Sequence, residues 1–196
     1  MPDPYMKKIY LFVILALLCS PTFSQKLMHG IGPGILVEKI RGIDPEFSLL
    51  FTYSPRINVS ETETMSLSLG IPISIGIGGS LDNGYMGDYT PYTFWINTPL
   101  ILNVNFGAGS TKENKEKVGF FVGAGFAQQF GVHTSGDYTA GNSSSTTSTY
   151  GPTGNIGFRF AVGSHQKNIE TKMTYMRGLG GDYEADIYGL MVLFNF

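Results

Sequence analysis

The chain has 196 residues and a formal net charge of −2, with 42% hydrophobic and 14% charged residues. These values suit one globular domain, and 26 glycines with 13% aromatic residues favour strands and turns over a helical bundle. Because no cluster of lysine and arginine is interleaved with aromatic residues, nucleic-acid binding is excluded as a partner class.

The first 24 residues have the pattern of a secretory signal peptide. Lys7 and Lys8 precede an apolar run over 9–18, which is too short to span a membrane as a helix. Small residues follow, with Thr22 and Ser24 in the −3 and −1 positions before Gln25. We therefore expect residues 1–24 to be removed and residues 25–196 to form the mature domain, whether translation starts at Met1 or at Met6.

The single cysteine, Cys19, raises the alternative of a bacterial lipoprotein that is acylated on this residue. Such a cleavage site needs a small residue directly before the cysteine, whereas Leu18 stands there, so an ordinary signal-peptide residue is favoured. A mature chain that begins at Gln25 has no cysteine, and we expect neither disulfides nor a thiolate metal site in it.

Alternation of apolar and small or polar residues recurs through the mature chain, as in β-strands. It predicts eight strands, over 29–38, 46–58, 65–78, 92–107, 117–132, 152–163, 168–177 and 186–196.

The stretch "MSLSLGIPISIGIG" at 65–78 shows which face meets which environment. Its odd positions are large and aliphatic, whereas its even positions are Ser, Gly or Pro. Strands of soluble proteins usually have about five or six residues, whereas a strand that crosses a bilayer needs roughly nine to eleven. A large apolar face over a small, polar one indicates an apolar exterior around a polar lumen, as in an outer-membrane barrel. Pro72 falls on the lumen side and predicts a local bulge or bend.

The charges within the predicted strands fall on the lumen face by parity: Glu38, Glu46, Arg56, Arg159, Glu170 and Lys172. In lipid such side chains would cost roughly 2–4 kcal/mol each near the midplane. In a lumen they can pair, so we predict an ion-pair network of Arg56, Arg159, Glu170 and Lys172. A structural role for these charges is favoured over a catalytic Glu170, because both signs are present.

The connections between the predicted strands alternate between two ends of the barrel. The connections 39–45, 79–91, 133–151 and 178–185 would lie outside the cell, and 59–64, 108–116 and 164–167 would face the periplasm. The Ser/Thr/Gly-rich segment 133–151 is the longest of them and is expected to be a flexible surface loop. The fold class predicted is all-β, an eight-stranded antiparallel up-and-down transmembrane β-barrel.

Three segments resemble a known group of proteins: "TFWINTPLILNVNFG" at 93–107, "KVGFFVGAGFAQQFGV" at 117–132 and "YGLMVLFNF" at 188–196. They resemble the PorT-like outer-membrane β-barrel family, which is built like the OmpA-type membrane domain. The resemblance implies a cell outer-membrane location in a Gram-negative envelope. It also implies that the C-terminal segment is the signal read by the barrel-assembly machinery, carried by Tyr188, Leu190, Val192, Phe194 and Phe196.

A barrel of eight strands has an interior just wide enough for side chains to fill, and Leu50, Trp95 and Phe121 are candidates to fill it. The favoured function is therefore non-enzymatic, structural or interactive, with loops exposed at the cell surface. Alternatives are a narrow pore for small solutes or ions and, less favoured, a lipid-modifying enzyme. The partners expected are outer-membrane lipid, the assembly machinery and other envelope proteins.

An enzyme would need a histidine beside a nucleophile at the rim, and the three histidines are isolated at 29, 133 and 165. Only His133 has a serine and an aspartate nearby, Ser135 and Asp137. No metal-ligand spacing and no cofactor motif is found, since Asp82, Asp88 and Asp182 belong to separate connections.

Overall fold

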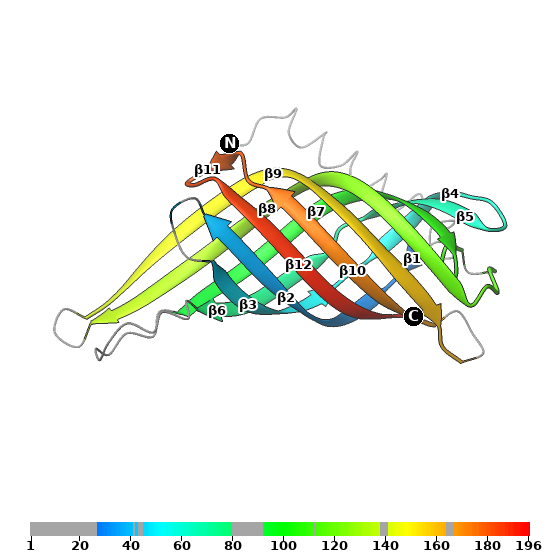
Figure 1. Ribbon diagram of the computed structural model, residues 1–196, viewed down its shortest axis with the longest axis horizontal. Helices are drawn as coiled ribbons and strands as arrows, with labels where there is room; N and C mark the ends of the chain where they lie inside the picture. Colours follow the sequence, from blue (N-terminus) through cyan, green and yellow to red (C-terminus); the bar gives the residue numbers. More distant parts are fainter. Residues whose placement is uncertain are drawn as a thin grey trace, which may run out of the picture.

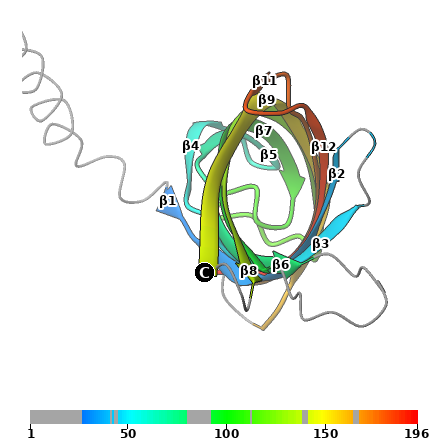
Figure 2. The ribbon, with the colours of Figure 1, turned by 90° about the vertical axis from the view of Figure 1, so that its left-hand side faces the viewer.

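The computed structural model shows a closed antiparallel β-barrel (Figures 1 and 2). It describes residues 27–40, 42, 45–79, 92–111, 113–137, 141–163 and 167–196. The predicted signal peptide, 1–24, lies outside the described residues. Among the residues that are described, no helix is long and apolar enough to cross a membrane.

Twelve strand segments make up the sheet. They are β1 (Leu27–Met28), β2 (Gly30–Ile40), β3 (Glu46–Tyr53), β4 (Arg56–Glu61), β5 (Met65–Gly70), β6 (Ile73–Gly79), β7 (Tyr92–Gly107), β8 (Val118–Asp137), β9 (Gly141–Ala161), β10 (Asn168–Arg177), β11 (Gly180–Gly181) and β12 (Ala185–Asn195). The pairs β3 with β4 and β5 with β6 each continue one barrel strand, so the barrel has the eight strands that the sequence predicts.

The barrel closes where the last strand pairs with the first. β12 is antiparallel to β2, from Ala185 opposite Ile40 to Asn195 opposite Gly30. Beyond this ladder the backbone N–H of Phe196 donates to the carbonyl of His29 at 2.9 Å. No edge of the barrel wall is therefore left open along this seam, which removes the aggregation hazard of an exposed edge strand.

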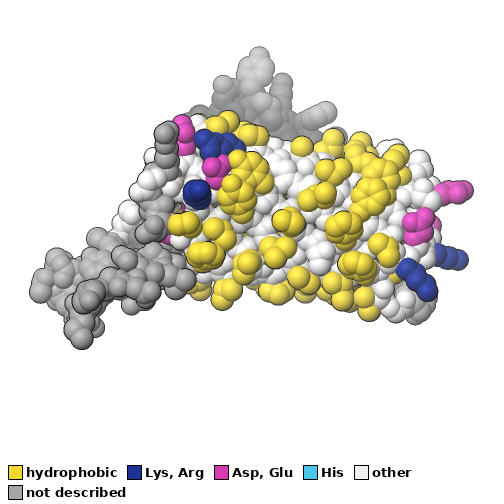
Figure 3. All heavy atoms as spheres, viewed as in Figure 1, with side chains coloured by type: hydrophobic (Ala, Val, Ile, Leu, Met, Phe, Trp, Pro, Cys, Tyr) yellow, Lys and Arg dark blue, Asp and Glu magenta, His cyan; other side chains and the backbone are white. Residues whose placement is uncertain are grey.

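The predicted faces of the strands are confirmed. Along 65–77 the odd positions are exposed or half-buried and the even positions are buried; Ser68, for example, is 0% exposed. Large apolar side chains cover the outside of the barrel. The most exposed of them is Leu49, at 73%. In Figure 3 they form a broad band over the wall, with charged side chains near its two ends. This is the inverted polarity of a barrel whose outer surface faces lipid.

Two prolines interrupt neighbouring strands at the same level. β3 gives way to β4 at Pro55, and β5 gives way to β6 at Pro72. The register is the same on both sides of the break, since Tyr53 pairs with Ile73 and Arg56 pairs with Gly70. Pro72 is buried, as its parity predicts, but it leaves a local gap in pairing rather than a bulge because proline lacks a ladder donor. A β-bulge does occur nearby, further along β4, where the register shifts between Asn58 and Ser60.

The sequence predicts a surface loop over 133–151. In the structure this segment instead continues two strands. β8 runs to Asp137 and β9 starts at Gly141, and the two pair along their whole length. The hairpin extends beyond the rest of the barrel wall at the left of Figure 1. The alternation rule missed it because side chains outside a membrane meet water on both faces, so an apolar period is not required.

Candidate functional site

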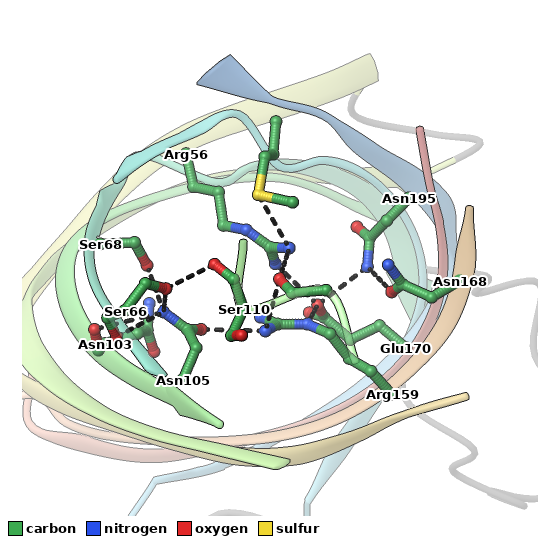
Figure 4. A network of polar contacts seen from close by, with 12 residues as sticks. Arg56, Ser66, Ser68, Asn103, Asn105, Ser110, Arg159, Asn168, Glu170 and Asn195 are labelled. Carbon is green, nitrogen blue, oxygen red and sulfur yellow. Dashed lines mark hydrogen bonds and ion pairs between the residues drawn. The ribbon is translucent and has the colours of Figure 1, made fainter. Parts of the chain in front are cut away.

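The lumen contains a cluster of buried polar side chains, and Glu170 on β10 lies at its centre (Figure 4). Its Oε2 atom accepts from the guanidinium of Arg159 at 2.7 Å and from that of Arg56 at 3.1 Å. The Asn195 amide donates to the same oxygen at 3.0 Å. Arg159 comes from the neighbouring strand, whereas Arg56 lies on β4 across the lumen, so these bonds tie opposite walls together.

The fourth residue of the predicted network, Lys172, is buried on the same face of β10 and interacts electrostatically with Glu170, whereas the direct ion pairs to Glu170 come from the two arginines. The Glu170 oxygen is directed towards the two arginines, and Lys172 lies two positions along the strand, where it lines a cavity. The structure thus joins Arg56, Arg159 and Glu170 and leaves Lys172 beside them.

The first part of the turn between β7 and β8, residues 108–111, folds into the lumen, whereas most of the described residues over 113–117 are exposed. Ala108, Ser110 and Thr111 are buried, and the end-on view in Figure 2 shows the ribbon of this turn crossing the space enclosed by the strands. The carbonyl of Gly109 accepts from Arg56 at 3.0 Å and from Arg159 at 3.4 Å. We call residues 108–111 the inner turn.

Further bonds hold the inner turn to the wall. The Ser110 carbonyl accepts from Ser66 at 2.6 Å and from the Asn58 amide at 2.8 Å, and the Ser110 hydroxyl donates to the Thr64 carbonyl at 3.2 Å. Asn105 bridges the two sides of the cluster, since its Nδ2 donates to Ser68 at 2.9 Å and its Oδ1 accepts from Arg159 at 3.0 Å. The half of the lumen next to the β7–β8 turn is therefore filled by a connected set of hydrogen bonds.

Apolar side chains fill much of the remaining interior. Leu50, Trp95 and Phe121 are buried, as their parity predicts. The Phe121 ring lies against the Arg159 guanidinium, 4.3 Å from ring centroid to Cζ, which is a cation–π contact. A buried apolar cluster on β2, β3, β8, β10 and β12 comprises Leu36, Leu50, Ala127, Met176, Ala185, Ile187, Met191 and Leu193.

A smaller polar group lies towards the outer end of the lumen. Glu38 Oε2 accepts from the Gln129 amide at 3.4 Å, and the Tyr183 hydroxyl lies close to the same carboxylate. Burial raises the pKa of Tyr183, and the nearby Glu38 carboxylate adds to this rise. At the rim, Asp186 accepts from Arg177 at 2.7 Å and from the Tyr175 hydroxyl at 2.7 Å.

The remaining candidates for chemistry are not brought together among the described side chains. His29 stacks between the rings of Tyr53 and Phe196, at 5.9 and 5.8 Å between centroids. Asp182 accepts from the backbone N–H of Ser148 at 2.6 Å. The side chains of His133, Ser135 and Asp137, and all of Asp82, Asp88 and His165, lie outside the described residues. No group of three potential metal ligands occurs among the side chains that are described.

The residues assigned to the C-terminal signal share one position in the fold. Tyr188, Leu190, Val192 and Phe194 alternate along β12 on its outer, exposed face, and Phe196 follows directly after the strand. This face is available to lipid or to another protein, while the alternate residues of β12 face the lumen.

Parity did not identify the amides and backbone groups that complete the lumen cluster. A usable signal exists for Asn105 and Asn195, since both are asparagines on the lumen face of predicted strands. No such signal marks the Gly109 carbonyl. The inner turn could not be found from its composition, because "GAGSTKENKEK" is equally typical of a solvent-exposed turn.

The comparisons with known proteins find similarity in structure but not in sequence. The fold is similar to that of neisserial surface protein A, NspA, with a TM-score of 0.55 and 10% identity over 86% of this chain and 95% of that one. The small outer-membrane β-barrels share this fold. Ail, the attachment invasion locus protein of Yersinia pestis, is similar with a TM-score of 0.52 and 12% identity over 88% of this chain and 99% of that one. A second Ail structure, solved with the heparin analogue sucrose octasulfate, has a TM-score of 0.51 and 11% identity over 87% of this chain and 98% of that one.

No family model matches the chain, and no curated protein matches it in sequence. The small outer-membrane barrels therefore support the barrel architecture of this chain, while its PorT-like or OmpA-type membership stays a prediction.

Proposed function

We propose that this chain is a non-enzymatic outer-membrane protein that presents the β8–β9 hairpin at the cell surface to a protein partner. The observation that carries this proposal is the contrast between a filled lumen and a hairpin that extends beyond the wall. A filled lumen leaves little room for diffusion, whereas an extended hairpin offers contact surface.

The lengths of the two strands support a projecting hairpin. β8 has 20 residues and β9 has 21, against 10 in β10. A tilted strand needs roughly nine to eleven residues to cross a bilayer, so about half of each hairpin strand is left outside it. The orientation of this end towards the cell exterior follows the rule that the longer connections of such barrels are extracellular.

The hairpin also has a backbone edge to offer. On its outer side β9 pairs with β10 only up to Thr153 and with β11 at Thr149 and Tyr150. Within the described chain, residues 141–148 of β9 have β8 as their one ladder partner. An exposed edge can accept an extended segment of another protein as an added strand.

The composition of this hairpin separates it from binders of polyanions. Segment 133–151 contains no lysine or arginine and is rich in serine and threonine. The sulfated ligand present in one Ail structure would find no counter-charge on this segment, so we expect an uncharged polypeptide surface to be the partner.

The test is cross-linking to envelope or surface proteins on cells that carry the wild-type chain or a shortened hairpin. Deleting 132–135 together with 143–146 removes four paired positions from each strand and preserves the tip and the alternation. We expect the cross-linked partner to be lost while the heat-modifiable band of the folded barrel is kept. A deletion of equal total length within the connection 80–91 is the control, and capture that survives the hairpin deletion would contradict the proposal.

A further inference from the structure

The connection between β10 and β12 leans onto β9 instead of joining its own two strands directly (Figure 1). β10 pairs with β9 only up to Thr153. Further towards the hairpin, β11 takes over as the outer partner of β9, because its two glycines pair with Thr149 and Tyr150. We call residues 178–184 the strap. The strap therefore supports the base of the β8–β9 hairpin after β10 has ended.

Asp182 makes the last contact between the strap and the outer edge of β9. Its carboxylate accepts from the backbone N–H of Ser148 at 2.6 Å and from the Ser148 hydroxyl at 3.1 Å, and its own N–H donates to the Ser148 carbonyl at 2.8 Å. Hydrogen bonds to an ionised carboxylate are stronger than those between neutral groups. Beyond Ser148, residues 141–147 of β9 have β8 as their one ladder partner in the described chain. The hairpin therefore leaves its support on this side at Asp182.

The next residue of the strap holds the hairpin base from inside the barrel. Tyr183 is half-buried and packs against the apolar cluster of the lumen, and its hydroxyl lies close to Gln129 on β8 and Thr147 on β9. The Thr149 hydroxyl donates to the Tyr183 carbonyl at 3.0 Å. Two consecutive residues thus hold the same base, Asp182 at the edge of β9 and Tyr183 on its lumen side.

The way in which its base is held decides how the hairpin is presented. A ribbon of two strands has little stability of its own in water, so beyond the barrel wall its direction and order depend on its support. An edge that is already ordered loses less conformational freedom when another strand pairs with it. Loss of the Asp182 bonds would free the base of the edge to open locally.

We propose that Asp182 is a positioning residue, which holds the β8–β9 hairpin in one direction so that its free edge over 141–147 can accept an added strand. This inference rests on the proposed function, because it names the residue on which presentation of the hairpin depends. Asp182 acts through Ser148 and needs no contact with the partner itself.

The first test measures the hairpin without any partner. Hydrogen exchange of the folded barrel in detergent micelles, followed by mass spectrometry, should show faster deuterium uptake over 141–150 in Asp182→Ala than in the wild type. Uptake over β12 should be unchanged. Asp182→Asn keeps an acceptor oxygen and should restore most of the protection. Glu184→Ala is the matched control, since it removes an exposed carboxylate from the same strap.

The second test is cross-linking on cells that carry the same variants. Asp182→Ala should lose capture of the partner while keeping the heat-modifiable band, and Asp182→Asn and Glu184→Ala should retain capture. Unchanged exchange in Asp182→Ala, or undiminished capture despite faster exchange, would overturn the inference. If Asp182→Ala does not fold, Asp182→Ser takes its place with the same expected losses. If the wild type captures no partner, the proposed function fails, while the exchange comparison still decides whether Asp182 holds the hairpin.

Discussion

Glu170 is the residue on which the lumen cluster depends, since one carboxylate oxygen receives two guanidinium groups and an amide. Breaking a buried charge pair by removing one partner typically costs about 3–5 kcal/mol, because the other charge stays buried and unpaired. We expect Glu170→Gln to lower the free energy of unfolding by about this amount in urea titrations followed by the gel shift of the folded barrel. Glu184→Gln, at an exposed position, is the control; equal midpoints for the two variants would contradict the assigned role.

The orientation of side chains can be tested at two adjacent residues of β6. Ile73 is exposed on the outer face, whereas Ser74 is buried and lines the cavity beside Lys172. Ile73→Asp places a carboxylate in lipid at a cost of about 1–2 kcal/mol, less than for lysine or arginine at the same depth. Ser74→Asp places it near a cation, so folding into lipid vesicles should be impaired more by Ile73→Asp. A reversed order would show that the faces are exchanged.

The sequence predicts side-chain contacts between neighbouring strands better than contacts across the lumen. The contact of Arg159 with Glu170 follows from parity and strand order, because the two residues lie on adjacent strands. The contact of Arg56 with Glu170 crosses the lumen, and it depends on the tilt and stagger of the barrel, which no local pattern encodes.

At the scale of elements, the inner turn is the feature that local composition did not predict, and a glycine in it allows a test. Gly109 has a φ of +67°, and a Cβ there would lie 2.6 Å from Asn168 Nδ2 and 3.1 Å from Arg159 Cδ. Gly163 has a similar φ of +72°, but nothing lies within 4 Å of its Cβ position. Both alanine variants carry the cost of a left-handed backbone, and only Gly109→Ala adds a clash.

We therefore expect Gly109→Ala to destabilise the barrel by about 1–3 kcal/mol more than Gly163→Ala does. The measurement is equilibrium unfolding in urea with tryptophan fluorescence, for which Trp95 in the lumen is the reporter. Equal destabilisation would indicate that the inner turn leaves the lumen in solution.

Strand existence and most strand positions were predictable, because lipid on one side and a lumen on the other impose a strict period of two. The prediction was wrong where that constraint ends, at the β8–β9 extension, and incomplete at Pro55 and Pro72, where two predicted strands are interrupted.

For the whole molecule, the filled lumen predicts electrical silence. The half of the lumen next to the β7–β8 turn is occupied by the inner turn and the Glu170 cluster, and the central cavity of about 30 Å³ is lined largely by apolar side chains such as Leu36, Leu50 and Met191. Purified protein in a planar lipid bilayer should therefore give no steady single-channel steps. A folded, heat-modifiable sample that conducts would instead favour the narrow pore.

The pairing of β2 with β12 sets the order of events in biogenesis. The first barrel strand finds its second neighbour only when the last has been synthesised, so the wall cannot close while the chain is still emerging. Until then the β2 edge carries unsatisfied backbone donors and acceptors beside an apolar face, and pairing at such sequence separation is slow. The wall therefore stays open until β12 is in place, whatever the order in which the other strands pair.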